Sequence, residues 1–396
     1  GQNETYSSKI GYRPSESFLL RATWGTAFRA PNTRELFLQG ISGFTNVSDP
    51  CYIPQQAIES SLENPVPTYN PDLDQRDPEV LSNCLATGVD PTLANNGGNN
   101  TFSTEVYQVG TFDLDPETSE SYSYGFSYEQ DFSNKFDLAF GMTYYSTTIE
   151  DTVISPSAGF AISDCYFDEA GQGASAFCGN IQRDLTDPTD PRIEFIDLQF
   201  INRDQERARG IDYNLTFSDV IDLGVPVDFS VNLAANRLLE RSTSFTNADG
   251  GVDYETYQGE WGFPEWRGIA QARLGWDKWS LNWQTRYLGA VGQDPEAVDV
   301  FSEATTRSDT CLGPPDDELC RDYAETGSYM VHNLSLFYRE DNWTLGMGVR
   351  NLEDKAPPLA DPTELQGVKA RPIGYGYDVL GRTFFLNASY NLDIGF

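Results

Sequence analysis

The chain ends on the stretch Arg382–Phe396, which reads R-T-F-F-L-N-A-S-Y-N-L-D-I-G-F. Every second residue from Phe384 is apolar, and the residues between, Phe385 apart, are polar or glycine. Because successive side chains of a strand point to opposite faces, this alternation predicts one β-strand with an apolar face and a polar face. A strand of about 13 to 16 residues rises about 45 to 55 Å, which suits a tilted strand that crosses a bilayer better than a globular strand. The residues expected on the apolar face are Phe384, Leu386, Ala388, Tyr390, Leu392, Ile394 and Phe396.

The same period-two alternation recurs along the chain and predicts ten strands. Residues 1–10 are expected to be the tail of an earlier strand, and the fourth of the ten strands is expected to be one long element from Phe195 to about Phe217. The predicted strands begin near residues 18, 122, 136, 195, 225, 266, 279, 334, 343 and 382.

The connections between these strands alternate strictly between short and long. Tight turns on one side and long loops on the other are typical of outer-membrane barrels, so the sequence predicts an all-β fold, a transmembrane antiparallel β-barrel. The short connections are expected at 13–16, 133–134, 219–224, 277–278 and 340–342, and the long ones, which would be extracellular, at about 30–118, 151–194, 241–263, 291–325 and 355–380.

The composition agrees with a barrel that crosses the membrane with strands. No apolar run approaches 18 residues and no export signal opens the chain, so neither a helical span nor a targeting peptide is expected. The mean hydropathy of -0.46 does not argue against a barrel, because alternation dilutes the apolar signal. The aromatic content of 13% fits the aromatic girdles that such barrels carry at both membrane interfaces.

The charge balance is strongly acidic and excludes one class of partner. The formal net charge is -34, from 60 acidic and 26 basic residues, which argues against a nucleic-acid partner. Solvated acidic loops are the simplest explanation. Calcium binding by carboxylates such as Asp113 and Asp115, or those at 316–318, is the alternative, although their spacing lacks the glycine and the terminal glutamate of an EF-hand. No metal site or cofactor is predicted.

All six cysteines lie in the predicted long connections. No two have the C-x-x-C spacing of a metal site, and disulfides persist where the environment oxidises. Each local disulfide would stabilise a loop without a core by about 3 kcal/mol in the chain-entropy model. The alternative is six free thiols. Only free thiols are alkylated without reduction, so the mass of the protein after alkylation distinguishes disulfides from free thiols. In sequence order the expected pairs are Cys51 with Cys84, Cys165 with Cys178, and Cys311 with Cys320.

The predicted polar face carries many small residues. In a closed ten-stranded barrel this face would have to fill a narrow lumen, whereas in a barrel of about 22 strands it lines a wide channel that holds a separate plug. The glycines at 125, 141, 275, 346 and 348 fill little space, so an arc of a wide barrel is preferred.

Three stretches and the terminal Phe396 resemble TonB-dependent receptors of Gram-negative bacteria. The stretches are G-T-A-F-R-A-P-N-T-R-E-L-F at 25–37, N-L-E-D-K-A-P-P at 351–358 and Y-D-V-L-G-R-T-F-F at 377–385. The resemblance implies the last ten strands of an outer-membrane barrel of about 22 strands. Asp49–Cys51 and Asn83–Cys84 look like a subgroup of large proteobacterial receptors with cysteine-bearing loops. The plug domain and the TonB box of the family are absent from this sequence.

The resemblance also implies a function and a set of partners. The expected function is TonB-energised uptake of a scarce large nutrient, an Fe(III)-siderophore or similar chelate ahead of an oligosaccharide, and the alternative is a passive pore or adhesion barrel without a plug. An acidic mouth would disfavour anionic ligands. The implied partners are the TonB–ExbB–ExbD complex, reached through residues outside this sequence, outer-membrane lipid and lipopolysaccharide, the barrel-assembly machinery, the small-molecule or glycan ligand and a surface lipoprotein.

Few residues point to chemistry. An outer-membrane protease would need a histidine on the lumen face, but His332 shares its face with Leu334 and Leu336, and no G-x-S-x-G motif is present, so no enzyme is predicted. Ligand contacts are expected from polar residues near the mouth and from loop aromatics, although packing is the commoner role of such aromatics. The candidates are Arg29, Asn32, Arg350 and Tyr107, with Tyr52 and Tyr69 as further aromatics.

Overall fold

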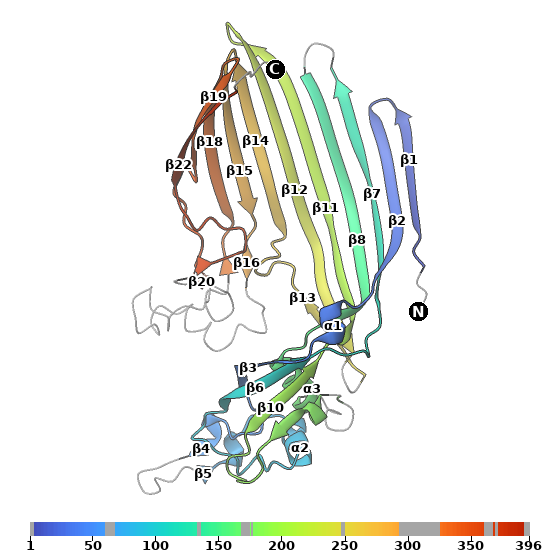
Figure 1. The fold of residues 1–396 in the computed structure, drawn as a ribbon, viewed down its shortest axis with the longest axis vertical. Helices are drawn as coiled ribbons and strands as arrows, with labels where there is room; N and C mark the ends of the chain where they lie inside the picture. Colours follow the sequence, from blue (N-terminus) through green and yellow to red (C-terminus); the bar gives the residue numbers. More distant parts are fainter. Residues whose placement is uncertain are drawn as a thin grey trace.

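The computed structural model describes residues 4–59, 68–132, 136–167, 175, 177–246, 250–292, 325–359, 367–368 and 371–391 (Figure 1). Its main element is an antiparallel sheet in which each strand pairs with the next along the path β1-β2-β7-β8-β11-β12-β14-β15-β18-β19-β22. The sheet is curved but not closed. The strands are β1 Ser7–Ser15, β2 Phe18–Arg29, β7 Glu117–Asp131, β8 Phe136–Ile154, β11 Ile201–Asp222, β12 Pro226–Thr246, β14 Trp266–Trp276, β15 Trp279–Leu288, β18 Tyr329–Arg339, β19 Trp343–Arg350 and β22 Thr383–Tyr390.

The predicted antiparallel all-β architecture is confirmed. The ten predicted strands correspond to β2 and its successors along this path, and β1 is the strand expected to precede them. The first turn differs, because β1 continues through Pro14 to Ser15 with a register shift between Tyr12 and Ser15. Proline, which has no N–H to donate, is tolerated at an irregular point of a strand at the sheet edge. The predicted turn at 133–134 and the residues 392–396 lie outside the described residues.

The short and long connections lie at opposite ends of the sheet. Figure 1 shows the tight turns at the top, here called the turn end, and the long connections at the bottom, here called the loop end. In the described parts of the chain, no helix is long and apolar enough to cross a membrane.

The register separates an apolar face from a polar face. Phe384 and Leu386 of β22 are each 76% exposed on the apolar face, and their neighbours on adjacent strands are also apolar. Two belts of aromatic rings lie on this face. Tyr124 stacks on Tyr144 nearer the loop end, and the tilted rings of Trp279 and Tyr338 are in contact nearer the turn end. Such belts match the interfacial girdles of membrane barrels. One cross-strand row contains Val231, Ala272, Trp283, Leu334, Val349 and Phe384.

Two of the long connections fold together, which contradicts the expectation of loops without a core. We call this unit, formed by the described residues of 30–116 and 155–200, the loop subdomain; it lies beyond the loop end of the main sheet (Figure 1). Its sheet has the order β3-β6-β10-β9, and the central strands β6 and β10, one from each connection, are parallel. Its elements are α1 Thr33–Phe37, β3 Ile41–Ser48, η1 Gln55–Ala57, β4 Ile58–Glu59, β5 Thr68–Tyr69, η2 Pro71–Leu73, α2 Pro78–Ala86, β6 Thr101–Val109, α3 Ala158–Tyr166, η3 Cys178–Asn180, β9 Ile181–Arg183 and β10 Ile193–Gln199.

The prediction of one long strand from Phe195 is therefore wrong. Phe195 belongs to β10, and the chain passes through Phe200 before β11 begins at Ile201 in the main sheet. Ile196 and Leu198 of β10 are fully buried in the core of the loop subdomain, so this segment packs there instead of extending the main sheet.

The remaining long connections carry short strands. β12 continues to Thr246 and pairs with β13, Val252–Thr256, so this hairpin extends beyond the point where a loop was expected. The other two connections carry the pairs β16 Val291–Gly292 with β17 Glu325–Thr326, and β20 Gly367–Val368 with β21 Arg371–Pro372.

The two faces of β22 should respond differently to the same charge. Leu386→Arg places a cation on the apolar face and is expected to cost about 2 to 4 kcal/mol if that face meets the middle of a bilayer. Asn387→Arg places it on the polar face beside Gly346 and should be mild. Heat-modifiable assembly of the protein measures both, and equal losses would contradict the assigned faces.

Candidate functional site

Helix α1 is held at the loop end of β2 by a network of charged side chains. Arg29 binds Glu35 through Nη1, at 3.0 Å, and Glu117 through Nη2, at 2.6 Å. The Asn32 side chain accepts hydrogen bonds from the backbone N–H groups of Arg34 and Glu35, and Glu35 accepts one from the Asn32 N–H, which completes a capping box. The structure thus gives Arg29 and Asn32 a structural role, and their proposed role in ligand binding is untested.

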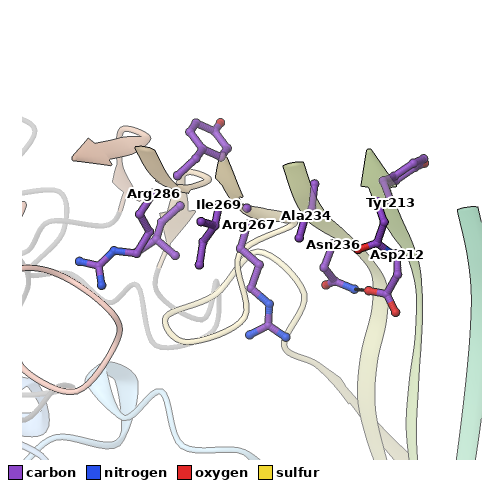
Figure 2. Close-up of a pocket in the computed structure, with 12 residues that line it drawn as sticks. Asp212, Tyr213, Ala234, Asn236, Arg267, Ile269 and Arg286 are labelled. Carbon is purple, nitrogen blue, oxygen red and sulfur yellow. Dashed lines mark hydrogen bonds between the residues drawn. The ribbon is translucent and has the colours of Figure 1, made fainter. Parts of the chain in front are cut away.

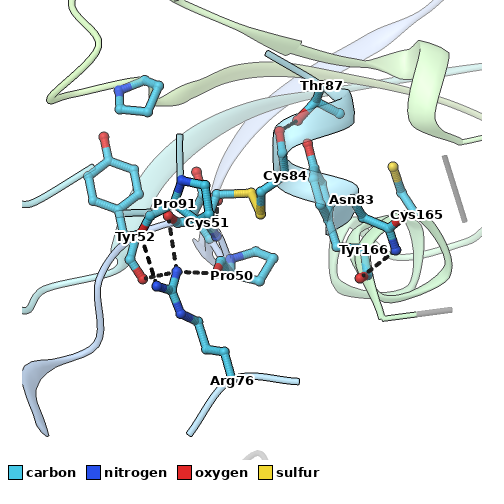
Figure 3. The surroundings of a disulfide bond; sticks show 12 residues. Pro50, Cys51, Tyr52, Arg76, Asn83, Cys84, Thr87, Pro91, Cys165 and Tyr166 are labelled. Atoms are coloured by element: carbon cyan, nitrogen blue, oxygen red, sulfur yellow. Dashed lines mark hydrogen bonds between the residues drawn. A yellow bond between two sulfur atoms is a disulfide. The ribbon is translucent and has the colours of Figure 1, made fainter. Parts of the chain in front are cut away.

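Two disulfides stabilise the loop subdomain. Cys51 is bonded to Cys84 and Cys165 to Cys178, with Cα–Cα distances of 5.6 and 5.1 Å. The prediction of disulfides is confirmed for these two pairs, whereas Cys311 and Cys320 lie outside the described residues. The two connections also bind each other directly, because Asn83 Nδ2 of α2 donates to the Tyr166 carbonyl of α3 at 3.0 Å (Figure 3).

Two buried arginines organise the chain around these disulfides. Arg183 forms a bidentate pair with Asp49, with N–O distances of 2.5 and 2.8 Å, and their side chains are only 3% and 0% exposed. Arg183 Nε also donates to the Tyr166 hydroxyl. Burial lowers the pKa of Arg183, but the hydrogen bonds to Asp49, the charge of Asp49 and the contact with Tyr166 together outweigh burial and raise this pKa above its ordinary value. The pair therefore joins the segment after β3 to β9, which come from different connections.

Arg76 holds the backbone beside Cys51 in place. Its Nη1 donates to the carbonyls of Pro50, Cys51 and Tyr52 at 3.2 to 3.3 Å, and its Nη2 donates to that of Pro91 (Figure 3). Asp74 pairs with Arg76 at 2.7 Å. Burial raises the pKa of Asp74, but the hydrogen bonds from Arg76 and Tyr69 and the charge of Arg76 together outweigh burial, so this pKa lies below its ordinary value.

Of the three candidate loop aromatics, Tyr52 is buried, whereas Tyr69 and Tyr107 are half-buried, and the Tyr107 hydroxyl donates to the Gln39 carbonyl. Tyr52 is buried and donates to Asp190, and the Tyr69 hydroxyl donates to Asp74. Tyr107 lies on the face of β6 opposite the core, with its ring 6.1 Å from that of Phe195.

A second aromatic group, not identified from the sequence, lies at the loop end of β18. Trp261, Tyr329, Tyr375 and Tyr377 form this aromatic cluster, with ring centroids 5.1 Å apart for Tyr329 and Tyr377 and 5.9 Å for Trp261 and Tyr377. The Lys355 ammonium lies 5.4 Å from the Tyr329 ring centre. In the sequence, the Y-G-Y stretch at 375–377 is the only local feature that indicates this cluster.

Several hollows lie along the main sheet. One, of about 710 Å³, lies toward the turn end, where Asp137, Asp228 and Arg273 are among its lining residues. Another, of about 440 Å³, spans β11 to β15 and is lined by residues of both faces, because Arg267 and Arg286 extend on the side opposite Tyr213 (Figure 2). A further hollow, of about 530 Å³, contains the predicted ligand residue Arg350, whose guanidinium carbon lies 5.7 Å from the centre of the Phe385 ring. It is also lined by Ser230, Asn232, Gln271, Arg273, Asn282, Gln284, Asn333 and Ser335.

Histidine and acidic residues do not form a chemical centre in the part of the chain that the structure describes. His332 pairs with Thr285 on the apolar face, as predicted, and its Nδ1 lies 2.8 Å from the Thr285 hydroxyl. Within the described ranges, no three His, Cys, Asp or Glu side chains are grouped so that they could hold a metal ion.

Comparison with known proteins identifies a matching family and several solved structures with a similar fold. The family model for the TonB dependent receptor-like β-barrel matches residues 1–352. Two mutants of the ferric enterobactin receptor of Pseudomonas aeruginosa, both in complex with enterobactin, are 16% and 18% identical, with TM-scores of 0.51, and the match covers 98% of this chain and 40% of theirs. The siderophore receptor PirA of Acinetobacter baumannii is 13% identical, with a TM-score of 0.50 and coverage of 98% and 41%.

At these identities the comparison shows a shared fold. The chain spans about two fifths of the length of these solved receptors. No curated protein matches it significantly.

Removal of Arg183 should loosen the loop subdomain. Arg183→Ala leaves Asp49 charged and buried, which is expected to cost about 3 to 5 kcal/mol of local stability. Arg192→Ala is the matched control, because Arg192 and Asp190 are 49% and 39% exposed, and such surface pairs contribute about 0 to 1 kcal/mol. Proteolysis of the full-length receptor under native conditions measures both, and similar cleavage rates would contradict the assigned role of Arg183.

The Arg76 and Asp74 pair should make the loop subdomain sensitive to acid. Because the pKa of folded Asp74 lies below the ordinary value of 3.8, its stabilising effect is complete above that value and is lost as the pH falls through the folded pKa. Hydrogen exchange of the Cys51 and Tyr52 amides, corrected for intrinsic rates, should therefore accelerate below about pH 4 in the wild type. Asp74→Asn should flatten this response, whereas substitution of the exposed Asp72 should not; identical profiles for all three proteins would refute the assignment.

Proposed function

The chain belongs to the TonB-dependent receptor family, as its motifs predict, and from this premise we propose that it is the C-terminal barrel segment of an outer-membrane receptor for a scarce large nutrient. Receptors of this family are outer-membrane transport proteins and not enzymes. The chain matches two fifths of the length of the solved receptors. The activity, location and partners of the whole protein are therefore part of the proposal.

One observation carries the proposal. A long amphipathic meander presents an apolar face with aromatic belts, while its polar face is hollowed and its long connections gather at one end. An apolar band of this kind suits lipid, and a hollowed polar wall suits a channel that something else fills. A passive pore or adhesion barrel without a plug would also need the apolar band. It would not explain why the polar wall carries so many small residues.

An Fe(III)-siderophore or similar chelate is the ligand we propose. Solved receptors with this fold include a ferric enterobactin receptor in complex with enterobactin. The aromatic cluster and Tyr107 offer rings against which an aromatic chelator can stack, and the arginines of the polar wall suit an anionic one.

An oligosaccharide is the second candidate. Asn, Gln and Ser side chains line the hollow around Arg350, and such groups suit the hydroxyls of a sugar. Either ligand requires energy from outside the barrel, so the proposed partners are TonB with ExbB and ExbD, reached through residues outside this chain. Outer-membrane lipid and lipopolysaccharide, the barrel-assembly machinery and a surface lipoprotein complete the proposed set.

Growth of a deletion strain tests the proposal. Loss of the gene should slow growth when a ferric siderophore is the only iron source, and a TonB deletion should have the same effect. Complementation with the intact gene is the control. A defect only on oligosaccharide as carbon source would favour the second candidate, and a defect on neither nutrient would refute both.

A further inference from the structure

One strand edge of the loop subdomain has no partner among the described residues. β3 lies at one side of the sheet β3-β6-β10-β9 and pairs with β6 alone (Figure 1). No backbone hydrogen bond joins its other edge to a described residue. Because every second residue of a strand directs its N–H and C=O to the same side, this edge presents a row of unused donors and acceptors.

β3 lacks the features that usually protect a free edge. Exposed edge strands are commonly short, or carry charged residues or proline that discourage the addition of another strand. β3 has the sequence I-S-G-F-T-N-V-S, with no charge and no proline. By contrast, β9 at the opposite edge of the same sheet has only three residues, one of them Arg183. β13, which pairs with β12 alone, carries Asp253 and Glu255.

The side chains of β3 add an apolar surface to this edge. Phe44 is 74% exposed and Ile41 is 55% exposed, whereas only Val47 of this strand is buried in the core. In strand addition, hydrogen bonds along the backbone provide affinity and alternate side chains provide specificity. β3 offers both, because its free backbone edge and the exposed ring of Phe44 belong to the same strand.

The face of the sheet that carries Phe44 also carries two carboxylates. Phe44 is opposite Glu105, which is opposite Phe195 on β10, and in the next row Tyr107 is opposite Asp197. Neither Glu105 nor Asp197 takes part in an ion pair with a described residue. Oδ1 of Asp197 is buried without a hydrogen-bond partner. This face therefore alternates aromatic rings with carboxylates that lack a cation.

The loop subdomain as a whole is acidic. Its two connections, 30–116 and 155–200, contain twenty acidic and four basic residues. Three of the four, Arg76, Arg183 and Arg192, already pair with aspartates. A second copy of this chain would bring the same excess of negative charge to the edge, whereas a basic segment would be attracted to it.

We propose that β3 binds an extended, basic segment of another protein by strand addition. The segment forms backbone hydrogen bonds along the free edge, and an Arg or Lys beside Phe44 lies over the ring. Two strand spacings, about 10 Å, separate the backbone at this position from that of Glu105, and a long basic side chain shortens this distance. The interaction goes beyond the proposed uptake function, because it involves neither a chelate nor the polar wall.

A designed peptide tests this surface without knowledge of the natural partner. The probe is a short fluorescent peptide that alternates Arg and Val. Its control carries a methyl group on every backbone nitrogen, which removes the donors and keeps the charge. Fluorescence anisotropy measures binding to the purified protein at about 0.15 M salt, where long-range attraction is screened. The probe should bind at least about tenfold more tightly than its methylated control, because several hydrogen bonds are lost together.

A matched pair of variants locates the binding. Phe44→Lys removes the ring and places a cation at the edge, so it should weaken binding of the probe about tenfold. Leu85→Lys introduces the same charge on α2, which packs on the core face of the sheet, and Leu85 is 59% exposed. This control should change the affinity by less than about twofold. Alkylation without reduction shows whether the disulfides remain closed in both variants.

Glu105→Gln tests the charge complementarity separately. Because exposed ion pairs contribute little, this variant should weaken binding of the Arg and Val probe by about threefold. It should leave the affinity for a peptide that alternates Ser and Val unchanged.

Four results would each overturn the proposal. They are equal binding of the methylated control, equal effects of Phe44→Lys and Leu85→Lys, an affinity that Glu105→Gln leaves unchanged, and a protein that is dimeric in detergent and becomes monomeric with Phe44→Lys. The last result would assign the edge to a second copy of the chain. Peptide binding does not depend on the nutrient, so a failure of ferric siderophore uptake in cells would leave this inference intact.

Discussion

The structure depends on the requirement that each long strand satisfies its backbone through its neighbours while its two faces meet different surroundings. In lipid no water is available to bond exposed N–H and C=O groups, so a spanning sheet must pair every strand, and its side chains must alternate in polarity. The row from Val231 to Phe384 shows the result, because six strands place an apolar side chain at the same level. The same alternation places polar side chains, including arginines and amides, on the opposite face of the sheet, which forms the polar wall.

This constraint explains why the main sheet could be predicted and the loop subdomain could not. Period-two alternation is a local signal, and it located the strands of the meander from residues such as Phe384 and Leu386. The core of the loop subdomain comes from β6 and β10, which are parallel, separated by most of two connections and joined by no short turn. No glycine or proline separates the segment at 193–199 from β11, so the sequence merges them; only the burial of Ile196 and Leu198 in another core separates them.

The same distinction applies to individual functional residues. Arg29 and Asn32 belong to a recognisable motif, which identified them, but the motif does not reveal that the capping box and Glu117 occupy their polar groups. Arg267, Arg273 and Arg286 belong to no motif. Face assignment alone places them on the polar wall, but their relation to one another depends on register, and register across five strands follows from turn geometry and pairing.

Charge therefore has two separate roles in this molecule. In the loop subdomain, arginines stabilise the fold. Arg183 is buried against Asp49, and Arg76 donates hydrogen bonds to the carbonyls beside a disulfide, so neither presents a free charge to solvent. On the polar wall, by contrast, Arg273 lines a hollow together with Asp137 and Asp228, and Arg286 lines one together with Asp212. A net charge averages over these two populations. The net charge of -34 therefore does not predict the charge at any one position of the polar wall, where arginines and aspartates line the same hollows.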